Sequence, residues 1–341
     1  MPVRLVDRAP AIRTDALVAS LAPPPRFGAV RFSTYVPSPA EPTQAAAVAA
    51  LRTFADALRV APKRSFLGRR SAPRVRPGVY LDGGYGVGKT HLLASLWHEA
   101  PAPKAYCTFA ELTHLVGALG FAAAVEALSG HRLVAIDEFE LDDVGDTVLI
   151  STLLRSLVSS GVRLAATSNT LPGRLGQGRF AAEDFLREIQ GLAAHFDVVR
   201  IEGEDYRHRG LPPAPSPVST ALLEERAGAT PGASLDDFAA LCDHLESLHP
   251  VRYGDLLDGV TLACWRDVVP VANQATALRL VVLADRLYDR DVPVLASGVP
   301  FDRLFPDEFL AGGYRKKYLR AVSRLVALQR EGEGLAERGA G

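Results

Sequence analysis

The sequence predicts an α/β protein whose main domain is a doubly wound parallel sheet, and three observations lead to this fold class. A glycine-rich segment at residues 83–90 stands between an apolar strand pattern and a helical pattern. Strand and helix patterns alternate from residue 76 to residue 207, which is typical of parallel sheets with crossover helices. The third observation is a buried-strand pattern at residues 133–136 that is followed by two carboxylates.

Short apolar runs mark the strands of this domain, and amphipathic patterns mark its helices. Ligands of such sheets bind beyond the carboxyl ends of the strands, so polar residues at these ends are the candidate site. The predicted strands cover residues 79–81, 105–108, 133–136, 163–167 and 198–201. The predicted helices cover residues 90–98, 110–119, 122–128, 147–159 and 182–194.

Three further regions flank residues 76–207. Residues 1–75 are predicted to form an N-terminal arm, which prolines interrupt and which holds one amphipathic helix at 44–59. A proline-rich run predicts a linker over residues 208–233, and a mixed, mainly helical C-terminal region follows over 234–341. Its patterns predict helices at 235–244, 275–289 and 314–330, an apolar stretch at 260–271, a strand at 292–297 and a frayed tail at 331–341.

The glycine-rich segment matches the phosphate-binding loop G-x-x-x-x-G-K-T of P-loop NTPases. Its glycines let successive backbone N–H groups turn toward an anion, and the following helix presents its positive end. We expect Lys89 to reach the β- and γ-phosphates and Thr90 to hold Mg²⁺. The alternative, a chance glycine-rich turn, is disfavoured by both flanking patterns. The predicted nucleotide-binding residues are Gly83, Gly84, Tyr85, Gly86, Val87, Gly88, Lys89, Thr90 and His91.

Two later strands of the sheet end in polar side chains. Residues 133–136 lead into Asp137 and Glu138, the pattern of a Walker B motif. We expect Asp137 to orient the Mg²⁺ water shell and Glu138 to act as the general base toward the attacking water. The next strand ends in Thr167-Ser168-Asn169, and Asn169 is expected to sense the γ-phosphate, with simple entry into a turn as the alternative.

Phosphoryl transfer also needs a positive charge near the γ-phosphate, usually an arginine and often one from a neighbouring subunit. Arg187 is the preferred candidate for this arginine, because apolar neighbours on its predicted helix would pack and hold the helix in place. Arg174 and Arg179 are the alternatives, and each of the three could be a plain surface arginine. Arg279 in the C-terminal region is a further candidate for sensing the nucleotide.

Bulk composition limits the other function classes. The formal net charge of −1 disfavours a nucleic-acid coat or an anionic-membrane binder. The three cysteines are scattered and lack metal-site spacing, which predicts reduced thiols in the cytoplasm. The first residues lack the apolar stretch of a signal peptide, and no run is long and uncharged enough to predict a transmembrane segment.

Together these motifs resemble the ZapE-type, or AFG-like, ATPases, a family of AAA+-related P-loop proteins. Residues 205–207, Asp-Tyr-Arg, and residues 279–288 fit the family outside the nucleotide motifs, as does Pro24-Pro25-Arg26-Phe27. Cys107, Ala182 and Asp184 depart from its pattern, so the chain resembles a divergent bacterial member. The main motifs that carry the resemblance are Gly-x-Tyr-Leu-x-Gly-Gly-x-Gly-x-Gly-Lys-Thr, Ile136-Asp137-Glu138-Phe139 and Ala166-Thr167-Ser168-Asn169.

The resemblance implies an AAA+-like fold and Mg²⁺-dependent ATP hydrolysis coupled to remodelling or regulating a protein partner. It implies a role in cell division or membrane-protein quality control, with an FtsZ-like division protein or a membrane-associated protein as the client. An arginine that acts between subunits would also imply assembly into a homo-oligomer.

Two other functions stay open at the level of sequence. One is a helicase-loader-like AAA+ ATPase that acts on nucleic-acid machinery, which the segment 108–112 also resembles. The absence of a helix-turn-helix signature and of a long basic stripe argues against it. The other is a slow, nucleotide-gated scaffold, which the carboxylate of Glu138 argues against.

Overall fold

The computed structural model describes residues 2–10, 21–59, 76–84, 86–139, 144–171, 190–191, 193–203 and 214–338. The chain forms two compact units. The phosphate-loop unit comprises Arg13–Pro23 and Phe27–Arg209. The C-terminal unit comprises Met1–Ile12, Pro24–Arg26 and Gly210–Gly341.

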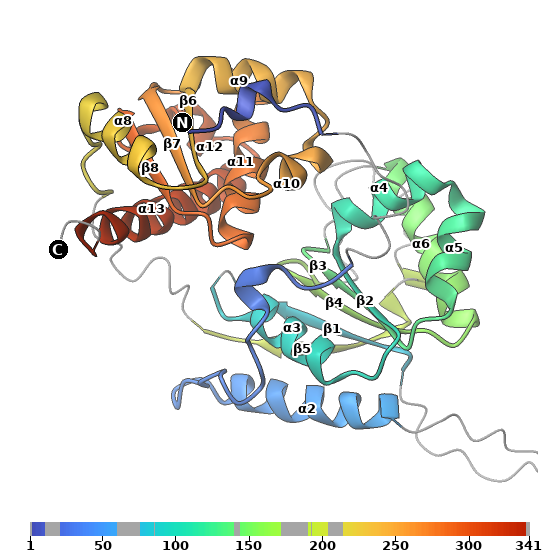
Figure 1. Ribbon diagram of the computed structural model, residues 1–341. Helices are drawn as coiled ribbons and strands as arrows, with labels where there is room; N and C mark the ends of the chain where they lie inside the picture. Colours follow the sequence, from blue (N-terminus) through green and yellow to red (C-terminus); the bar gives the residue numbers. More distant parts are fainter. Residues whose placement is uncertain are drawn as a thin grey trace, which may run out of the picture. The chain divides into compact units, whose positions relative to one another are not determined.

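The phosphate-loop unit is built on a five-stranded sheet with the order β2-β3-β4-β1-β5, and its strand pairs are parallel (Figure 1). Every strand predicted for residues 76–207 is present, so the doubly wound parallel sheet is confirmed. The glycine-rich segment follows the strand β1, and β4 separates β1 from β3. The strands are β1 (Gly78–Gly83), β2 (Lys104–Thr108), β3 (Leu133–Asp137), β4 (Arg163–Ser168) and β5 (Phe196–Ile201).

Helices cover both faces of this sheet (Figure 1). The helices α2 (Pro42–Arg59) and α3 (Lys89–Glu99) pack with Val79 and Leu81 on one face. The helices α4 (Phe109–Leu119), α5 (Phe121–Ser129) and α6 (Val144–Ser159) cover the other face. All five agree with the predicted helices within a few residues, because their apolar positions recur at helical spacing. The helix predicted at 182–194 lies mostly outside the described residues.

Strand register brings the polar ends of the sheet to one edge. Asp82 of β1 pairs with Ser168 of β4, and Asp137 of β3 pairs with Thr108 of β2. Since all five strands run in the same direction, these residues mark the carboxyl edge of the sheet. The polar residues at the ends of β1, β2, β3 and β4 therefore lie along one edge.

The C-terminal unit has its own parallel sheet of three strands in the order β6-β7-β8 (Figure 1). Its helices α9 (Phe238–Ser247), α11 (Gln274–Asp289) and α13 (Arg315–Arg338) bury one face of that sheet. The helix α8 (Thr220–Ala229) packs against the other face. The strands are β6 (Ala233–Asp237), β7 (Leu262–Val268) and β8 (Val294–Gly298), and shorter helices are α10 (Tyr253–Leu256) and α12 (Asp307–Ala311).

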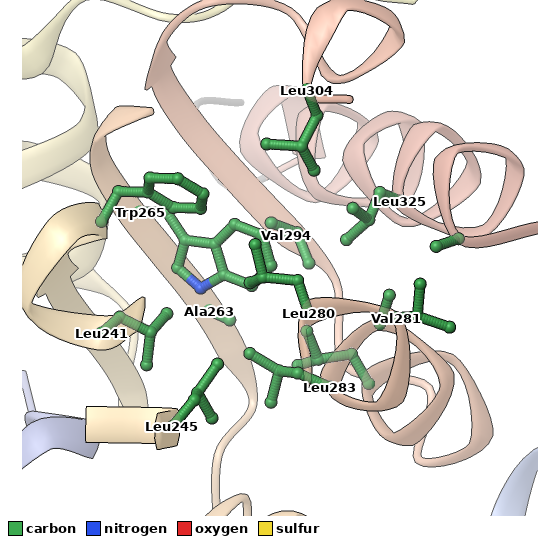
Figure 2. Close-up of a cluster of buried hydrophobic side chains, with 14 of the residues drawn as sticks. Leu241, Leu245, Ala263, Trp265, Leu280, Val281, Leu283, Val294, Leu304 and Leu325 are labelled. Atoms are coloured by element: carbon green, nitrogen blue, oxygen red, sulfur yellow. The ribbon is translucent and has the colours of Figure 1, made fainter. Parts of the chain in front are cut away.

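Trp265 lies at the centre of this second core (Figure 2). Its indole is fully buried, packs edge-on against Phe301 at 5.7 Å between ring centroids, and has leucines and valines of α9, α11, α13 and β8 around it (Figure 2). The indole is therefore part of the hydrophobic core of this unit. Short 3₁₀ turns complete the fold at η1 (Leu5–Asp7), η2 (Pro25–Phe27), η5 (Pro250–Arg252) and η6 (Phe301–Arg303).

Four local predictions differ from the structure. Residues 235–237, expected as the start of a helix, belong to β6, because their backbone pairs with β7 and Asp237 then caps α9. The predicted linker at 208–233 contains α8, whose Leu223 and Ala227 are buried against the sheet. The tail expected to fray from residue 331 continues α13 to Arg338. The expected N-terminal arm is divided between the two units rather than forming a separate region.

Within the described parts of the chain, no single helix is long and apolar enough to cross a membrane. The helices α4 and α5 reach that length and apolarity only as a pair, and the pair is bent by 119°.

Candidate nucleotide-binding site

The phosphate loop joins the end of β1 to the start of α3 and depends on glycines for its conformation. Gly86 and Gly88 have φ of 78° and 87°, in the left-handed region that glycine adopts at little cost. At Gly83 a Cβ atom would lie 2.4 Å from the carbonyl oxygen of Ile201, so the end of β5 leaves no room for a side chain there. The loop therefore combines left-handed backbone at Gly86 and Gly88 with close packing at Gly83. Tyr85 lies outside the described residues.

Lys89 connects the phosphate loop with the end of β4. Its ammonium donates to the carbonyl oxygens of Gly83 (2.8 Å) and Gly84 (2.5 Å). It also donates to Oδ1 of Asn169 at 2.8 Å. The structure thus brings together two predicted residues that lie 80 positions apart in the chain.

Asp137 is the centre of a hydrogen-bond network at the end of β3. Its Oδ1 accepts from the hydroxyl of Thr167, from the hydroxyl of Thr90 at 3.3 Å and from the amide of Glu138 at 3.1 Å. Its Oδ2 accepts from the hydroxyl of Tyr106 at 2.9 Å. The carboxylate is therefore held in one orientation by groups from α3, β2 and β4.

Burial and the neighbouring carboxylate of Glu138 raise the pKa of Asp137, while its hydrogen bonds with Thr167, Tyr106 and Thr90 act in the opposite direction. A buried carboxylate with a raised pKa is destabilised in its charged form and gains from a nearby cation. The electrostatics therefore favour the predicted role of Asp137 beside a metal ion.

Glu138 has an unusual backbone conformation for a residue other than glycine, with φ of 52°. Thr167 holds it, because its hydroxyl accepts from the amide of Glu138 at 3.0 Å and its carbonyl accepts from the amide of Phe139 at 2.7 Å. Phe139 is fully buried and packs edge-on against Phe109. Strained backbone of this kind persists where the surroundings over-determine it and is enriched at functional sites.

The arrangement fits a nucleoside triphosphate with Mg²⁺. Thr90 and Asp137 offer oxygen atoms 3.3 Å apart, and oxygen is the ligand type that Mg²⁺ prefers. The Lys89 ammonium places a positive charge beside the Gly83 and Gly84 carbonyl oxygens of the loop. When bound, Mg²⁺ would neutralise charge on the phosphate oxygens.

Three residues of this site were not among the sequence-predicted functional residues: Asp82, Tyr106 and Thr167. Asp82 is 8% exposed at the end of β1, and burial raises its pKa although Arg200 and Lys89 counteract the shift. Its place directly before Gly83 is a signal that could have identified it. Tyr106 and Thr167 act through Asp137, and only the strand register reveals them.

Of the other predicted residues, His91 lies in the first turn of α3 beside the loop, where its Nε2 contacts Thr34. Arg187, Arg174 and Arg179 lie outside the described residues. Arg279 donates to the carbonyl oxygens of Leu245 (3.0 Å) and Leu248 (2.9 Å) at the end of α9, which is a helix-capping contact within the C-terminal unit.

Two curated proteins and one solved structure illustrate what this chain is similar to. The cell division protein ZapE of Escherichia coli (strain K12) is 25% identical over 309 residues, which cover 77% of this chain and 81% of that protein. Lactation elevated protein 1 homolog B of Danio rerio is 26% identical over 235 residues, covering 56% of this chain and 45% of that protein. The crystal structure of DnaI gives a TM-score of 0.39 at 17% identity, covering 52% of this chain and 94% of the other.

The family model described as AFG1-like ATPase matches residues 12–335. That span includes the phosphate loop, the Walker B carboxylates and the whole three-stranded sheet of the C-terminal unit. The chain belongs to the AFG1-like ATPase family, with the P-loop α/β fold described above.

Proposed function

We propose that this protein hydrolyses ATP with Mg²⁺ and uses the reaction to remodel or regulate a protein partner. The observation that carries the proposal is the convergence of Lys89, Asn169, Thr90 and Asp137, with Glu138 adjacent, at the carboxyl edge of one sheet. Family membership supports ATP as the nucleotide.

Each residue has a distinct task in this proposal. Lys89 binds and orients the triphosphate, and Asn169 holds the Lys89 ammonium and contacts the terminal phosphate. Glu138 accepts the proton of the attacking water, and its fixed backbone reduces the reorganisation needed to do so. Thr90 and Asp137 hold the metal ion. Arg187 supplies positive charge near the γ-phosphate from a neighbouring copy of the chain.

The partner is inferred from the relatives. The name of the relative in Escherichia coli assigns that protein to cell division. We infer a client of the same kind here, either a division protein of the FtsZ type or a membrane-associated protein. Coupling to a protein agrees with the near-zero net charge, which gives no general attraction to nucleic acid.

Steady-state ATP hydrolysis across a series of protein concentrations tests the proposal. We expect wild-type turnover per subunit to rise with concentration, and Lys89→Ala and Glu138→Gln to lose at least about 100-fold in rate. Arg187→Ala is expected to remove the dependence on concentration. The matched controls Lys317→Ala, in α13 of the C-terminal unit, and Glu126→Gln, at an exposed position of α5, change the same residue types and are expected to behave as wild type.

The partner is tested in the same assay by adding FtsZ polymers, a membrane-protein substrate or a single-stranded DNA oligonucleotide. Purified FtsZ polymers are expected to raise turnover or to change length when ATP is hydrolysed. Stimulation by a single-stranded DNA oligonucleotide, with no response to FtsZ or to a membrane-protein substrate, would instead support the helicase-loader function. Equal turnover in wild type and Glu138→Gln, with ATP bound by both, would contradict hydrolysis and leave a nucleotide-gated scaffold.

A further inference from the structure

A short turn before α2 lies on the phosphate loop within the same unit. The turn, residues 31–35, is held by its own side chains, since the Thr34 hydroxyl accepts from the Arg31 amide (2.9 Å) and donates to the Arg31 carbonyl (2.8 Å). The Thr34 amide also donates to that carbonyl at 3.0 Å. This N-terminal turn is therefore stabilised by hydrogen bonds within itself.

Tyr35 makes the contact with the loop itself. Its hydroxyl donates to the carbonyl oxygen of Val87 at 2.9 Å. Its ring lies directly beside Gly88, where a Cβ atom would be 2.5 Å from Cε2 of the tyrosine. The ring also packs edge-on against His91, at 5.6 Å between ring centroids. One side chain thus contacts the last two loop residues before Lys89 and the first turn of α3.

His91 of α3 makes polar contacts with the turn. Its Nε2 lies 3.0 Å from Oγ1 of Thr34 and 3.2 Å from the carbonyl oxygen of Arg31. Because a carbonyl oxygen can only accept, we assign the hydrogen of this tautomer to Nε2. The ring therefore donates to the turn, and the turn and the helix are joined by polar contacts.

Gln44 holds the other end of the segment that follows the turn. It is 2% exposed, its Oε1 accepts from the Ser38 amide at 2.8 Å, and its Nε2 donates to the carbonyl oxygen of Glu202 at 2.9 Å. Glu202 directly follows β5, which packs against Gly83 at the start of the loop. The segment between residues 31 and 44 is thus anchored at both sides of the phosphate loop.

We propose that Tyr35 is a positioning residue, which holds the Val87–Gly88 part of the phosphate loop in the conformation that binds the triphosphate. The proposal rests on the proposed function, because it assigns how that same site is kept in shape. A loop that is already fixed does not lose conformational freedom when the ligand binds, so nucleotide affinity rises. Tyr35 does not need to contact the nucleotide to have this effect.

The KM for ATP and the kcat, measured for graded variants of Tyr35, test this role. Tyr35→Phe keeps the ring and removes the donor to Val87, and we expect KM to rise about fivefold, the effect of one hydrogen bond. Tyr35→Leu also removes the ring and is expected to raise KM further. In both variants kcat is expected to stay within about twofold of wild type, because the loop contacts ground and transition states alike.

Thr34→Val is a second, independent variant, because it removes the hydroxyl that joins the turn to His91 and is expected to raise KM in the same way. Tyr314→Phe, at an exposed tyrosine of the C-terminal unit, is the matched control and is expected to leave KM unchanged. Equilibrium binding of a fluorescent ATP analogue and the Tm are measured alongside.

The outcomes separate the two proposals. Wild-type protein that fails to bind ATP would overturn the proposed function. Wild type that binds ATP, with Tyr35→Phe and Thr34→Val matching it in KM, would overturn the role of Tyr35 and leave the proposed function intact. A lower Tm with unchanged KM would show that the turn only stabilises the fold, which also contradicts the inference.

Discussion

Asp137 accepts hydrogen bonds from Thr90, Thr167, Tyr106 and the amide of Glu138. Thr167 has a double function among these residues, because its hydroxyl donates to Asp137 and accepts from Glu138. The sequence motif identifies Asp137 and Glu138 but not the threonine that orients both, since the contact depends on the pairing of β3 with β4. At the scale of single residues, the motif therefore predicts the two carboxylates but not the residue that orients them.

Thr167→Val tests the role of the Thr167 hydroxyl, because valine has almost the same shape as threonine but lacks the hydroxyl. The variant loses the donor to Asp137 and the acceptor for Glu138, so we expect the ATPase rate to fall about 10- to 100-fold, as for other groups that orient metal ligands. Thr167→Ser keeps the hydroxyl and is expected to retain most of the rate. Steady-state assays with a parallel measurement of ATP binding check the prediction, and equal rates for the valine and serine variants would contradict it.

We expect the buried carboxyl of Asp236 to make the stability of the C-terminal unit depend on pH. Its carboxyl is 1% exposed, and burial raises its pKa although the backbone amides of Val6 and Leu5 counteract the shift. The folded state therefore binds the proton more tightly than the unfolded state. Asp236 therefore makes its full contribution to the free energy of unfolding below the pKa of the unfolded state, about 3.9. That contribution is lost as the pH rises through the raised pKa of the folded state.

Asp236→Asn removes the charge and keeps an oxygen that can accept from the Val6 amide. We expect the urea midpoint of the variant to exceed that of wild type at pH 7 and the difference to vanish near pH 3, where both side chains are neutral. Asp302→Asn, at an exposed position of the same unit, is the control and is expected to change little. A variant that is less stable than wild type at pH 7 would contradict the prediction.

Elements of the phosphate-loop unit follow their sequence patterns closely, whereas those of the C-terminal unit follow them in part. Residues 233–237 form a strand although they lead straight into α9, since pairing with β7 overrides a helical pattern that continues across the boundary. The helix α8 follows a proline-rich run, and burial of Leu223 and Ala227 stabilises it. Tertiary burial of this kind is not readable from local sequence.

The end of β8 gives a test at this scale. Gly298 has φ of 100°, and a Cβ atom would lie 2.3 Å from the carbonyl oxygen of Val268, so Gly298→Ala is expected to destabilise the unit by at least about 2 kcal/mol. At Gly228 in α8, a Cβ atom would meet none of the described residues within 4 Å. Gly228→Ala is therefore expected to stabilise the helix by about 0.5–1 kcal/mol.

Unfolding followed by tryptophan fluorescence measures the stability of both glycine variants. The chain has two tryptophans, so Trp97→Phe leaves Trp265 as the probe of the C-terminal core. Effects of the same sign at Gly298 and Gly228 would contradict the account of these two positions.

The first residues of the chain belong to the C-terminal unit, and no sequence pattern predicts this. Leu5 is fully buried in the core around Trp265, the amide of Val6 donates to Asp236 across 230 positions, and His244 donates to the carbonyl oxygen of Arg8. Such contacts depend on where distant segments meet in the folded molecule. An amphipathic pattern over so few residues is too short to indicate its partner.

Leu5→Ala tests the structural role of the N-terminal residues. We expect a loss of about 2–5 kcal/mol in the unfolding free energy reported by Trp265, because the substitution leaves a cavity in a packed core. Val36→Ala, at a side chain 82% exposed in the other unit, is expected to change stability by less than about 0.5 kcal/mol. Equal stability of Leu5→Ala and wild type would show that the N-terminal residues do not support this core.

Single-turnover conversion of pre-bound ATP tests the central claim most directly, because it separates binding from chemistry. Protein in excess over radiolabelled ATP and Mg²⁺ is followed to ADP for wild type and Glu138→Gln. We predict that both proteins bind ATP with similar affinity and that only wild type converts it at an appreciable rate. Equal conversion by the two proteins would contradict the assignment of Glu138 as the base and the account of the site built on it.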